Sequence, residues 1–460
     1  MLFVEDQPGC NGCPLRDAHP KANFVPPKLG RGLRLALGMN PGNDEVHHLP
    51  TPEPFVGKSG QFLRFGYDKI GVAWPDVTRA NVCQCRLSAP KNLFPTDEAA
   101  REYLSLPAAK EAIRHCWDTY VVPLLKSKRW GRIDLLGAPA LEKGTGKRGI
   151  LPHPGKACWA GTQLEMLDAP ELGAIAVATM HPAYLMRTGE FIPLFYNDLR
   201  RSLVPAPESY VLQGTPADYP TDVSTLSLDL ETNTANGPTG EIEIRLCGIG
   251  TEPYKGACFN WRDDRFRGWL QGAMQQVHDL YVHNGMAFDM PVLEENGIVF
   301  PWNFGTLGVP PTGEMRLWDT MLMHHLLWPT LRHDLGSLGR QYTSQPLWKD
   351  WKLTDDPEEL YCNRDQGNTH AIGVKLRAEL SREPKLLNLY RFTQLPLARI
   401  CLYMSQQGIT RDPTRIVKLR ERTEAQMFNT EKDLPLDLKS AVVTRNHNVP
   451  APPGTVSAKT

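Results

Sequence analysis

The sequence predicts two α/β domains followed by a short helical segment. The first observation behind this fold class is an alternation of helical patterns with apolar runs that are typical of buried strands. These runs lie at 33–38, 81–84, 133–137 and 174–180. The second observation is a stretch rich in Pro, Gly and polar residues at 204–222, VPAPESYVLQGTPADYPTD, which predicts a linker.

The third observation is a change of pattern after this linker. Strand-like runs come first, at 225–230, 242–250 and 281–283, and helical patterns dominate from about residue 315 onward. Two further amphipathic helices are expected within 385–433. We therefore expect a first domain at 1–205, a linker at 206–222, a second domain at 223–385 and a helical segment at 386–460.

Composition is that of an ordinary globular protein, with 41% hydrophobic and 22% charged residues. Lys+Arg and Asp+Glu balance at 51 each, so nucleic acid would have to bind local basic stretches such as 126–129 and 143–148. No run approaches the roughly 20 apolar residues of a membrane span, and the start MLFVEDQPGC lacks a basic signal-peptide region. We expect a cytoplasmic protein with no membrane partner.

Four motifs follow one another in the first domain. They are GMNPGNDE at 38–45, PFVGKSG at 54–60, TRANVCQCR around Asn81, and HPAYLMR at 181–187. A Gly/Pro/Asn segment after a strand is, taken alone, more often just a turn. Four motifs in a fixed order are far more specific.

In these motifs the chain resembles the uracil-DNA glycosylase superfamily, most closely its iron–sulfur family 4, over about residues 8–203. The resemblance implies a three-layer α/β/α domain that hydrolyses the N-glycosidic bond of uracil flipped out of DNA. It implies that His181 stabilises charge at uracil O2 and that Asn81 reads the base edge. Phe55 would stack on the base, Leu185 would fill the gap in the duplex, and Asn40 would hold the attacking water.

One departure from family 4 concerns the water motif. Family 4 usually has Glu at the position of Met39 and Ala at that of Asn40, whereas GMNPG resembles the single-strand-selective and mismatch-specific glycosylases. An Asn can position water but is a poor general base. A non-catalytic sensor of uracil or single-stranded DNA therefore stays open as the alternative function.

The cysteines provide a separate indication. Ten cysteines in a reducing compartment point to metal ligation before disulfides. The family resemblance implies a [4Fe–4S] cluster on Cys10, Cys13, Cys85 and Cys116, and a Cys₄ zinc site is the physical competitor. Cys83 is close enough to compete with Cys85, the spacing to Cys116 implies an insertion around 97–111, and Cys158 is expected to be a buried hydrophobe.

Carboxylates form the corresponding pattern in the second domain. Asp229 and Glu231 are two apart in a predicted strand, so both point to one face, where they would be costly without cations. Asp289 ends the segment HNGMAFD. Tyr361 and Asp365 are four apart in a helical pattern and share a helix face.

This series resembles the Tyr form of the DEDD exonucleases, as found in DNA polymerase I and other family A polymerases, over about 222–380. The resemblance implies an RNase H-like (DnaQ-type) exonuclease domain that binds two Mg²⁺ or Mn²⁺ ions through Asp229, Glu231, Asp289 and Asp365. Tyr361 would orient the attacking water and Asn284 would contact the substrate strand. Asp319 is expected only to cap the helix that begins at Thr320.

The segment from about Gln394 resembles the start of a family A polymerase domain, and the resemblance stops before the palm. We therefore expect a split or truncated polymerase, which would act with a separate polymerase subunit.

Together these patterns predict a DNA replication and repair protein that acts on uracil-containing DNA and on single-stranded 3′ ends. The rivals are the non-catalytic sensor joined to a proofreading exonuclease, and an accessory clamp on single strands in which both sites have decayed.

Overall fold

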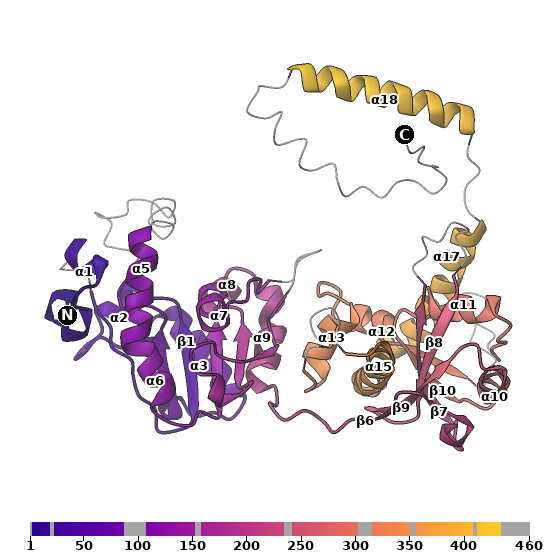
Figure 1. The fold of residues 1–460 in the computed structure, drawn as a ribbon, viewed down its shortest axis with the longest axis horizontal. Coiled ribbons are helices and arrows are strands. Elements are labelled where there is room, and N and C mark those ends of the chain that lie inside the picture. Colours follow the sequence, from indigo (N-terminus) through magenta and orange to yellow (C-terminus); the bar gives the residue numbers. More distant parts are fainter. Residues whose placement is uncertain are drawn as a thin grey trace. The chain divides into compact units, whose positions relative to one another are not determined.

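The computed structural model describes residues 2–18, 23–86, 107–151, 158–233, 242–301, 315–346, 348–349, 356–407 and 412–433. The chain divides into two units, Met1–Arg399 and Ile400–Thr460. The first unit contains two sheets, one built from the first half of the sequence and one from the second (Figure 1). An insertion was expected at 97–111, and its residues 97–106 lie outside the described part of the chain.

The first sheet has five strands in the order β2-β1-β3-β5-β4. All pairings except that of β4 with β5 are parallel. The strands are β1 (Arg34–Gly38), β2 (Val77–Asn81), β3 (Arg132–Leu136), β4 (Gln163–Leu164) and β5 (Ala176–Thr179). Parallel strands need crossovers, and helices supply them.

Helices cover both faces of this sheet. Leu35 and Leu37 of β1 belong to one apolar cluster, whereas Ala36 between them belongs to another, as expected for alternating side chains of a strand buried on both sides. The helices are α1 (Pro14–Ala18), α2 (Asn43–Val46), α3 (Lys58–Lys69), α5 (Pro107–Cys116), α6 (Val122–Lys126), α7 (Ala138–Thr145), α8 (Pro182–Leu185) and α9 (Ile192–Arg200). Short 3₁₀ or π turns lie at Val4–Asp6, Pro8–Cys10, Trp74–Asp76, Trp117–Val121, Pro170–Leu172 and Gly189–Phe191.

The second sheet has six strands in the order β11-β10-β7-β8-β9-β6. Strand β8 pairs in antiparallel fashion with β7 and with β9, and the other pairings are parallel. The strands are β6 (Ser209–Val211), β7 (Thr225–Thr232), β8 (Ile244–Gly250), β9 (Lys255–Asn260), β10 (Asp279–Val282) and β11 (Arg316–Asp319). The helices are α10 (Asp264–Met274), α11 (Asp289–Glu295), α12 (Thr320–Leu327), α13 (Leu335–Tyr342), α15 (Glu358–Ser381) and α16 (Pro384–Leu389), with short turns at Pro216–Asp218 and Tyr390–Gln394.

Helix α15 packs directly onto the centre of this sheet. A Cβ added at Gly248 of β8 would lie 2.9 Å from the Cys362 sulfur, and one added at Gly250 would lie 2.6 Å from the Gln366 side chain. Gln366 Oε1 accepts a hydrogen bond of 2.8 Å from the Ser227 hydroxyl of β7. The glycines of β8 therefore allow a close approach that brings α15 against the strand that carries Asp229 and Glu231.

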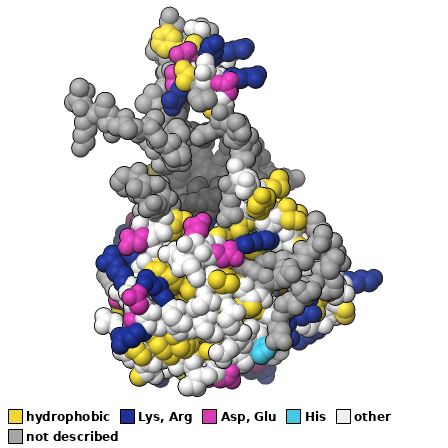
Figure 2. All heavy atoms as spheres, turned by 90° about the vertical axis from the view of Figure 1, so that its right-hand side faces the viewer, with side chains coloured by type: hydrophobic (Ala, Val, Ile, Leu, Met, Phe, Trp, Pro, Cys, Tyr) yellow, Lys and Arg dark blue, Asp and Glu magenta, His cyan; other side chains and the backbone are white. Residues whose placement is uncertain are grey.

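Helix α17 (Leu395–Gln407) spans the boundary between the units, and α18 (Pro413–Asp433) belongs to the second. On the face drawn in Figure 2, Lys and Arg side chains are interspersed with Asp and Glu, in keeping with the formal net charge of zero. Among the described residues, every helix is too short or too polar to cross a lipid bilayer.

The mixed α/β fold class predicted from the sequence is confirmed. The strands expected at 33–38, 133–137, 174–180, 225–230, 242–250 and 281–283 correspond to β1, β3, β5, β7, β8 and β10, with ends shifted by a few residues. The strand expected at 81–84 is wrong, because β2 ends at Asn81. Strands β4, β6, β9 and β11 were not expected; β6 lies within the predicted linker, and β11 lies where a helical pattern was expected.

Candidate active sites

A cavity of about 580 Å³ opens where the parallel strands of the first sheet end. Gly38 and Asn81, the last residues of β1 and β2, are paired in register, and His181 follows β5 by two residues. Ligands of open α/β sheets bind at the carboxyl ends of the strands. The lining side chains include Asn40, Asp44, Glu45, Phe55, Asn81, His181, Met186 and Arg187.

Phe55 is fixed against the strand ends by an unusual backbone conformation. Its φ is 62°, and its N–H donates to Glu45 Oε1 at 2.6 Å. Glu45 Oε2 accepts from the N–H of Gly42 at 2.6 Å, and burial raises the pKa of Glu45. Glu45, the last residue of the GMNPGNDE motif and one for which no role was predicted, thus positions Phe55. A Cβ at Gly38 would lie 2.7 Å from both the Phe55 ring and Asn81 Oδ1, so glycine is needed there.

Asn81 presents an unused hydrogen-bond donor. Its side chain is 2% exposed, and its Nδ2 has no partner among the described residues. Buried amide groups are nearly always hydrogen-bonded, so an unpaired one requires an explanation. Because Asn81 also lines the cavity, a ligand carbonyl there would satisfy this donor.

His181 presents a neutral donor on the same cavity. It is the N-cap of α8, and its Nδ1 accepts from the N–H of Ala183 at 3.1 Å, which leaves the proton on Nε2. Burial, and secondarily Arg187, lowers the pKa of His181 to about 4. A Cβ at Gly137 would lie 3.1 Å from His181 Cβ, so the glycine with φ of 92° leaves room for the imidazole.

Two residues predicted for the base pocket need comment. Asn40 lines the cavity, and its Nδ2 donates to the carbonyl of Pro41 at 3.2 Å. Leu185, which was expected to fill the gap in the duplex, is 1% exposed within the apolar core and would have to leave this core to enter a duplex. The next residue, Met186, is 49% exposed and lines the cavity. Met39 packs against the cysteine cluster described next.

Five buried cysteines form one cluster near the amino terminus: Cys10, Cys13, Cys83, Cys85 and Cys116. The backbone N–H of Gln84 donates to the Cys116 sulfur at 3.1 Å, and the Cys10 sulfur lies 3.5 Å from the Tyr120 hydroxyl. Interaction with Cys85 lowers the pKa of Cys10 to about 6, which favours a thiolate. Thiolates are ligands of zinc and of iron–sulfur clusters, and Cys83 lies within the group rather than apart from it. Cys158 is buried elsewhere, as expected.

Carboxylates gather on the second sheet beside α15. Carboxylate oxygens of Asp229 and Glu231 and the sulfur of Cys362 lie within 4.8 Å of one another, the one such group found among the described residues. Asp289, the first residue of α11, accepts from the N–H of Leu230 at 3.2 Å and is therefore tied to the same strand. Cys362 was not predicted from the sequence.

Burial, and after it the crowding of like charges, shapes the electrostatics of this group. Burial, followed by the charges of Asp365 and Asp289, raises the pKa of Asp229 well above its usual range. Burial raises the pKa of Glu231 and of Asp289 to about 7. A divalent cation would neutralise these neighbouring carboxylates, so a site of this kind favours cation binding. Mg²⁺ or Mn²⁺ therefore fits the donor set of Asp229, Glu231, Asp289 and Asp365.

Asp365 and Tyr361 project from α15 toward this group and share one cationic neighbour. Asp365 Oδ1 accepts from Trp348 Nε1 at 2.6 Å, and Oδ2 accepts from Lys349 Nζ. Lys349 Nζ also donates to the Tyr361 hydroxyl at 2.9 Å. Neither Trp348 nor Lys349 was predicted, because they belong to no motif.

Asp319 acts as a structural anchor. Its Oδ1 accepts from the backbone of Met321 and Leu322 at the start of α12, so the predicted helix cap is confirmed. The same carboxylate accepts from the N–H groups of Asn284 and Met286. Asn284 has a φ of 55°, and Asp319 thus holds the loop in which Asn284 lies.

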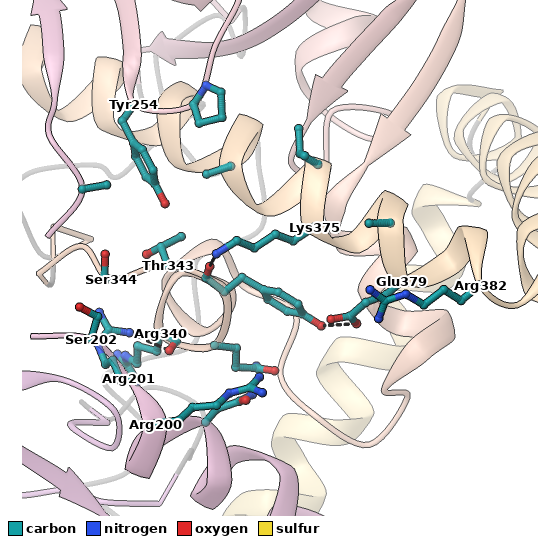
Figure 3. A pocket seen from close by; sticks show the side chains of 18 residues that line it. Arg200, Arg201, Ser202, Tyr254, Arg340, Thr343, Ser344, Lys375, Glu379 and Arg382 are labelled. Atoms are coloured by element: carbon teal, nitrogen blue, oxygen red, sulfur yellow. Dashed lines mark hydrogen bonds between the residues drawn. The ribbon is translucent and has the colours of Figure 1, made fainter. Parts of the chain in front are cut away.

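A basic cavity of about 720 Å³ lies elsewhere in the first unit (Figure 3). Its charged lining consists of five cations, Arg200, Arg201, Arg340, Lys375 and Arg382, and one carboxylate, Glu379. The Nε atoms of Arg201 and Arg340 are buried without hydrogen-bond partners among the described residues. Phosphate oxygens are the acceptors that such a surface favours.

Comparison with known proteins bears on the first domain. Residues 33–200 match the model of a family described as the Uracil DNA glycosylase superfamily. The similarity to this superfamily thus covers most of the first sheet and the cavity at its strand ends. No curated protein matches the chain.

Among solved structures, Brucella melitensis NrnC is 16% identical, covers 44% of this chain and 96% of that chain, and has a TM-score of 0.32. NrnC with bound Mg²⁺ is 15% identical with a TM-score of 0.28 and the same coverage. A structure described as the apo form of the nuclease is 16% identical, with a TM-score of 0.32 and the same coverage.

Proposed function

We propose that the second domain is a metal-dependent 3′–5′ exonuclease acting on single-stranded DNA. The observation that carries this proposal is the gathering of Asp229, Glu231, Asp289 and Asp365 from three elements, β7, α11 and α15. Four carboxylates in one partly buried site repel one another unless cations are bound, so a purely structural role would be costly.

The roles of the residues follow from their chemistry. Two Mg²⁺ or Mn²⁺ ions held by the four carboxylates would supply an activated water and stabilise charge on the leaving 3′ oxygen. The Tyr361 hydroxyl would orient the attacking water, and Asn284, on its loop anchored by Asp319, would contact the substrate strand. Cys362 lies beside these residues, and its thiol donates a long hydrogen bond of 3.7 Å to the backbone carbonyl of Asp229.

The test is degradation of a 5′-labelled single strand with Mg²⁺ or Mn²⁺, with EDTA, and with a chemically blocked 3′ end. Asp229→Ala should abolish degradation, and the exposed Asp264→Ala serves as the matched control. Mononucleotide release that is independent of metal, or that is unchanged in Asp229→Ala, would contradict the proposal.

A second activity, excision of uracil, is favoured by a separate observation. The cavity of the first domain offers an unpaired amide donor from Asn81, a neutral Nε2–H from His181 and the ring of Phe55. A uracil has two carbonyls and an aromatic face that suit these groups. His181 would stabilise the negative charge that develops on the departing base, and Asn40 would hold the water.

The alternative, a uracil or single-strand sensor without catalysis, concerns the same cavity. Position 39 carries a Met that packs against the cysteine cluster, so no carboxylate is supplied from this position. Met186, exposed beside the cavity, is the side chain we assign to the gap left in the duplex in place of Leu185.

Incubating uracil-containing DNA with the protein in EDTA, followed by alkali to cleave abasic sites, separates the two functions. Alkali-labile sites at uracil, and none at thymine, support excision. Uracil-selective binding with no abasic sites after hours would favour the sensor.

A further inference from the structure

Both oxygens of the Asp365 carboxylate are occupied by neighbouring residues of one segment. Trp348 Nε1 donates to Oδ1 at 2.6 Å, and Lys349 Nζ donates to Oδ2. Each carboxylate oxygen keeps a second lone pair, but an ammonium hydrogen-bonded to Oδ2 repels a divalent ion at the same carboxylate. The proposed exonuclease site therefore requires a rearrangement around Asp365.

Trp348 is fixed in place by packing. It is 3% exposed and belongs to the core of the second sheet. A Cβ added at Gly339 of α13 would lie 2.3 Å from the indole ring, which shows how closely the backbone approaches it. Withdrawal of Trp348 would open a cavity, so Oδ1 stays bound to the indole.

Lys349, in contrast, reaches the site with a flexible and partly exposed side chain. Its side chain is 29% exposed, against 3% for that of Asp365. A lysine has a flexible four-carbon stem, and its ammonium is strongly hydrated once it reaches solvent. Asp365 Oδ2 is thus the ligand atom that becomes available.

Lys349 also supplies a positive charge that offsets the repulsion among the carboxylates. Within the described part of the chain, it is the one side-chain cation that hydrogen-bonds any of Asp229, Glu231, Asp289 and Asp365. Its ammonium also lies 2.9 Å from the Tyr361 hydroxyl and 4.8 Å from the centre of that ring. One ammonium therefore holds both a proposed metal ligand and the proposed water-orienting group.

We propose that Lys349 is the built-in counter-ion of the exonuclease site, which occupies the place of one divalent ion and withdraws when that ion binds. This inference rests on the proposed exonuclease function. Withdrawal releases Asp365 Oδ2 for the ion and frees the Tyr361 hydroxyl in the same step. Lys349 is thus a positioning residue that links metal loading to the arrangement of the site.

The test is calorimetric titration of the full chain with Mn²⁺, comparing the wild type with Lys349→Met and Lys349→Gln. Removal of the competing ammonium should tighten Mn²⁺ binding about tenfold, which corresponds to ~1.4 kcal/mol. The melting temperature in EDTA should fall in both variants, since the four carboxylates lose their counter-ion. Lys349→Arg, which keeps the charge, should stay closer to the wild type.

The matched control is Lys255→Met, which removes an exposed lysine paired with Glu252 on the same domain. Unchanged or weaker Mn²⁺ affinity in both Lys349 variants, with binding intact in the wild type, overturns the inference and leaves the exonuclease proposal standing. No Mn²⁺ binding by the wild type itself overturns the exonuclease proposal, and the inference with it.

Discussion

Replacing Asp289 by Asn should stabilise the metal-free protein at alkaline pH, although it removes a proposed metal ligand. Asp289 is 6% exposed, and burial is the main reason that its pKa rises to about 7. An Asn side chain keeps an oxygen that can accept from the N–H of Leu230 and carries no charge. The substitution thus removes a buried charge while preserving the local hydrogen bond.

The magnitude follows from the pKa. The folded state holds the Asp289 proton up to a pH of about 7, whereas an unfolded Asp releases it near 3.8. An acid whose pKa is raised in the folded state therefore destabilises the fold. This loss of stability is absent below about pH 4, grows between pH 4 and 7, and is complete above pH 7. The full difference corresponds to at most ~4 kcal/mol, and since neighbouring acids share the strain, we expect ~1–3 kcal/mol at pH 8.

Thermal unfolding in EDTA at pH 5 and pH 8 measures this effect. Asp289→Asn should raise the melting temperature of the second domain at pH 8 by several degrees, and by clearly less at pH 5. Asp264→Asn, a control at a side chain that is 84% exposed, should change neither. A variant that is equal to or less stable than the wild type at pH 8 in EDTA would refute the electrostatic reasoning.

Three further predictions concern the first domain and the basic cavity. His181→Ala should slow uracil release roughly 10²-fold in single-turnover assays, and since the pKa of His181 is about 4, this imidazole should impose no pH dependence between pH 5 and 8. Cys10→Ser should remove the broad iron–sulfur absorption at about 400 nm from anaerobically purified protein, whereas Cys158→Ser should keep it. A colourless wild-type protein with one zinc per chain would contradict the iron–sulfur cluster. Arg382→Ala should lower the salt dependence of single-strand binding by a slope of about 1, measured by fluorescence anisotropy in EDTA. An unchanged slope would mean that Arg382 of the basic cavity does not contact DNA phosphates.

The sequence predicted the parts of the fold that alternation and turn residues encode. Strands β1 and β5 consist mainly of apolar residues that are buried, so pattern alone located them. Strand β2 reads VTRAN, and its polar residues are buried because Arg79 pairs with Glu53 from a distant loop. Strand β9 reads KGACFN, in which glycine weakens the alternation. Such elements are decided by tertiary partners.

The same division holds for the sites. Asp229 and Glu231 were predictable because the period of a strand fixes their common face. Lys349 was not, because its contact with Asp365 joins residues that are 16 apart and belong to no common motif. Leu185 and Met186 are adjacent, and only the direction of one short helical turn decides which of them is exposed.

We expect four carboxylates of the second domain to bind divalent ions, and a crystal soaked in Mn²⁺ would show such ions by their anomalous scattering. Peaks for two ions are expected among Asp229, Glu231, Asp289 and Asp365, with Lys349 turned away from Asp365. In Asp229→Ala crystals at least one peak should be lost. A fully soaked crystal with no peak at these carboxylates, and with Lys349 still bound to Asp365, would overturn the proposed metal site.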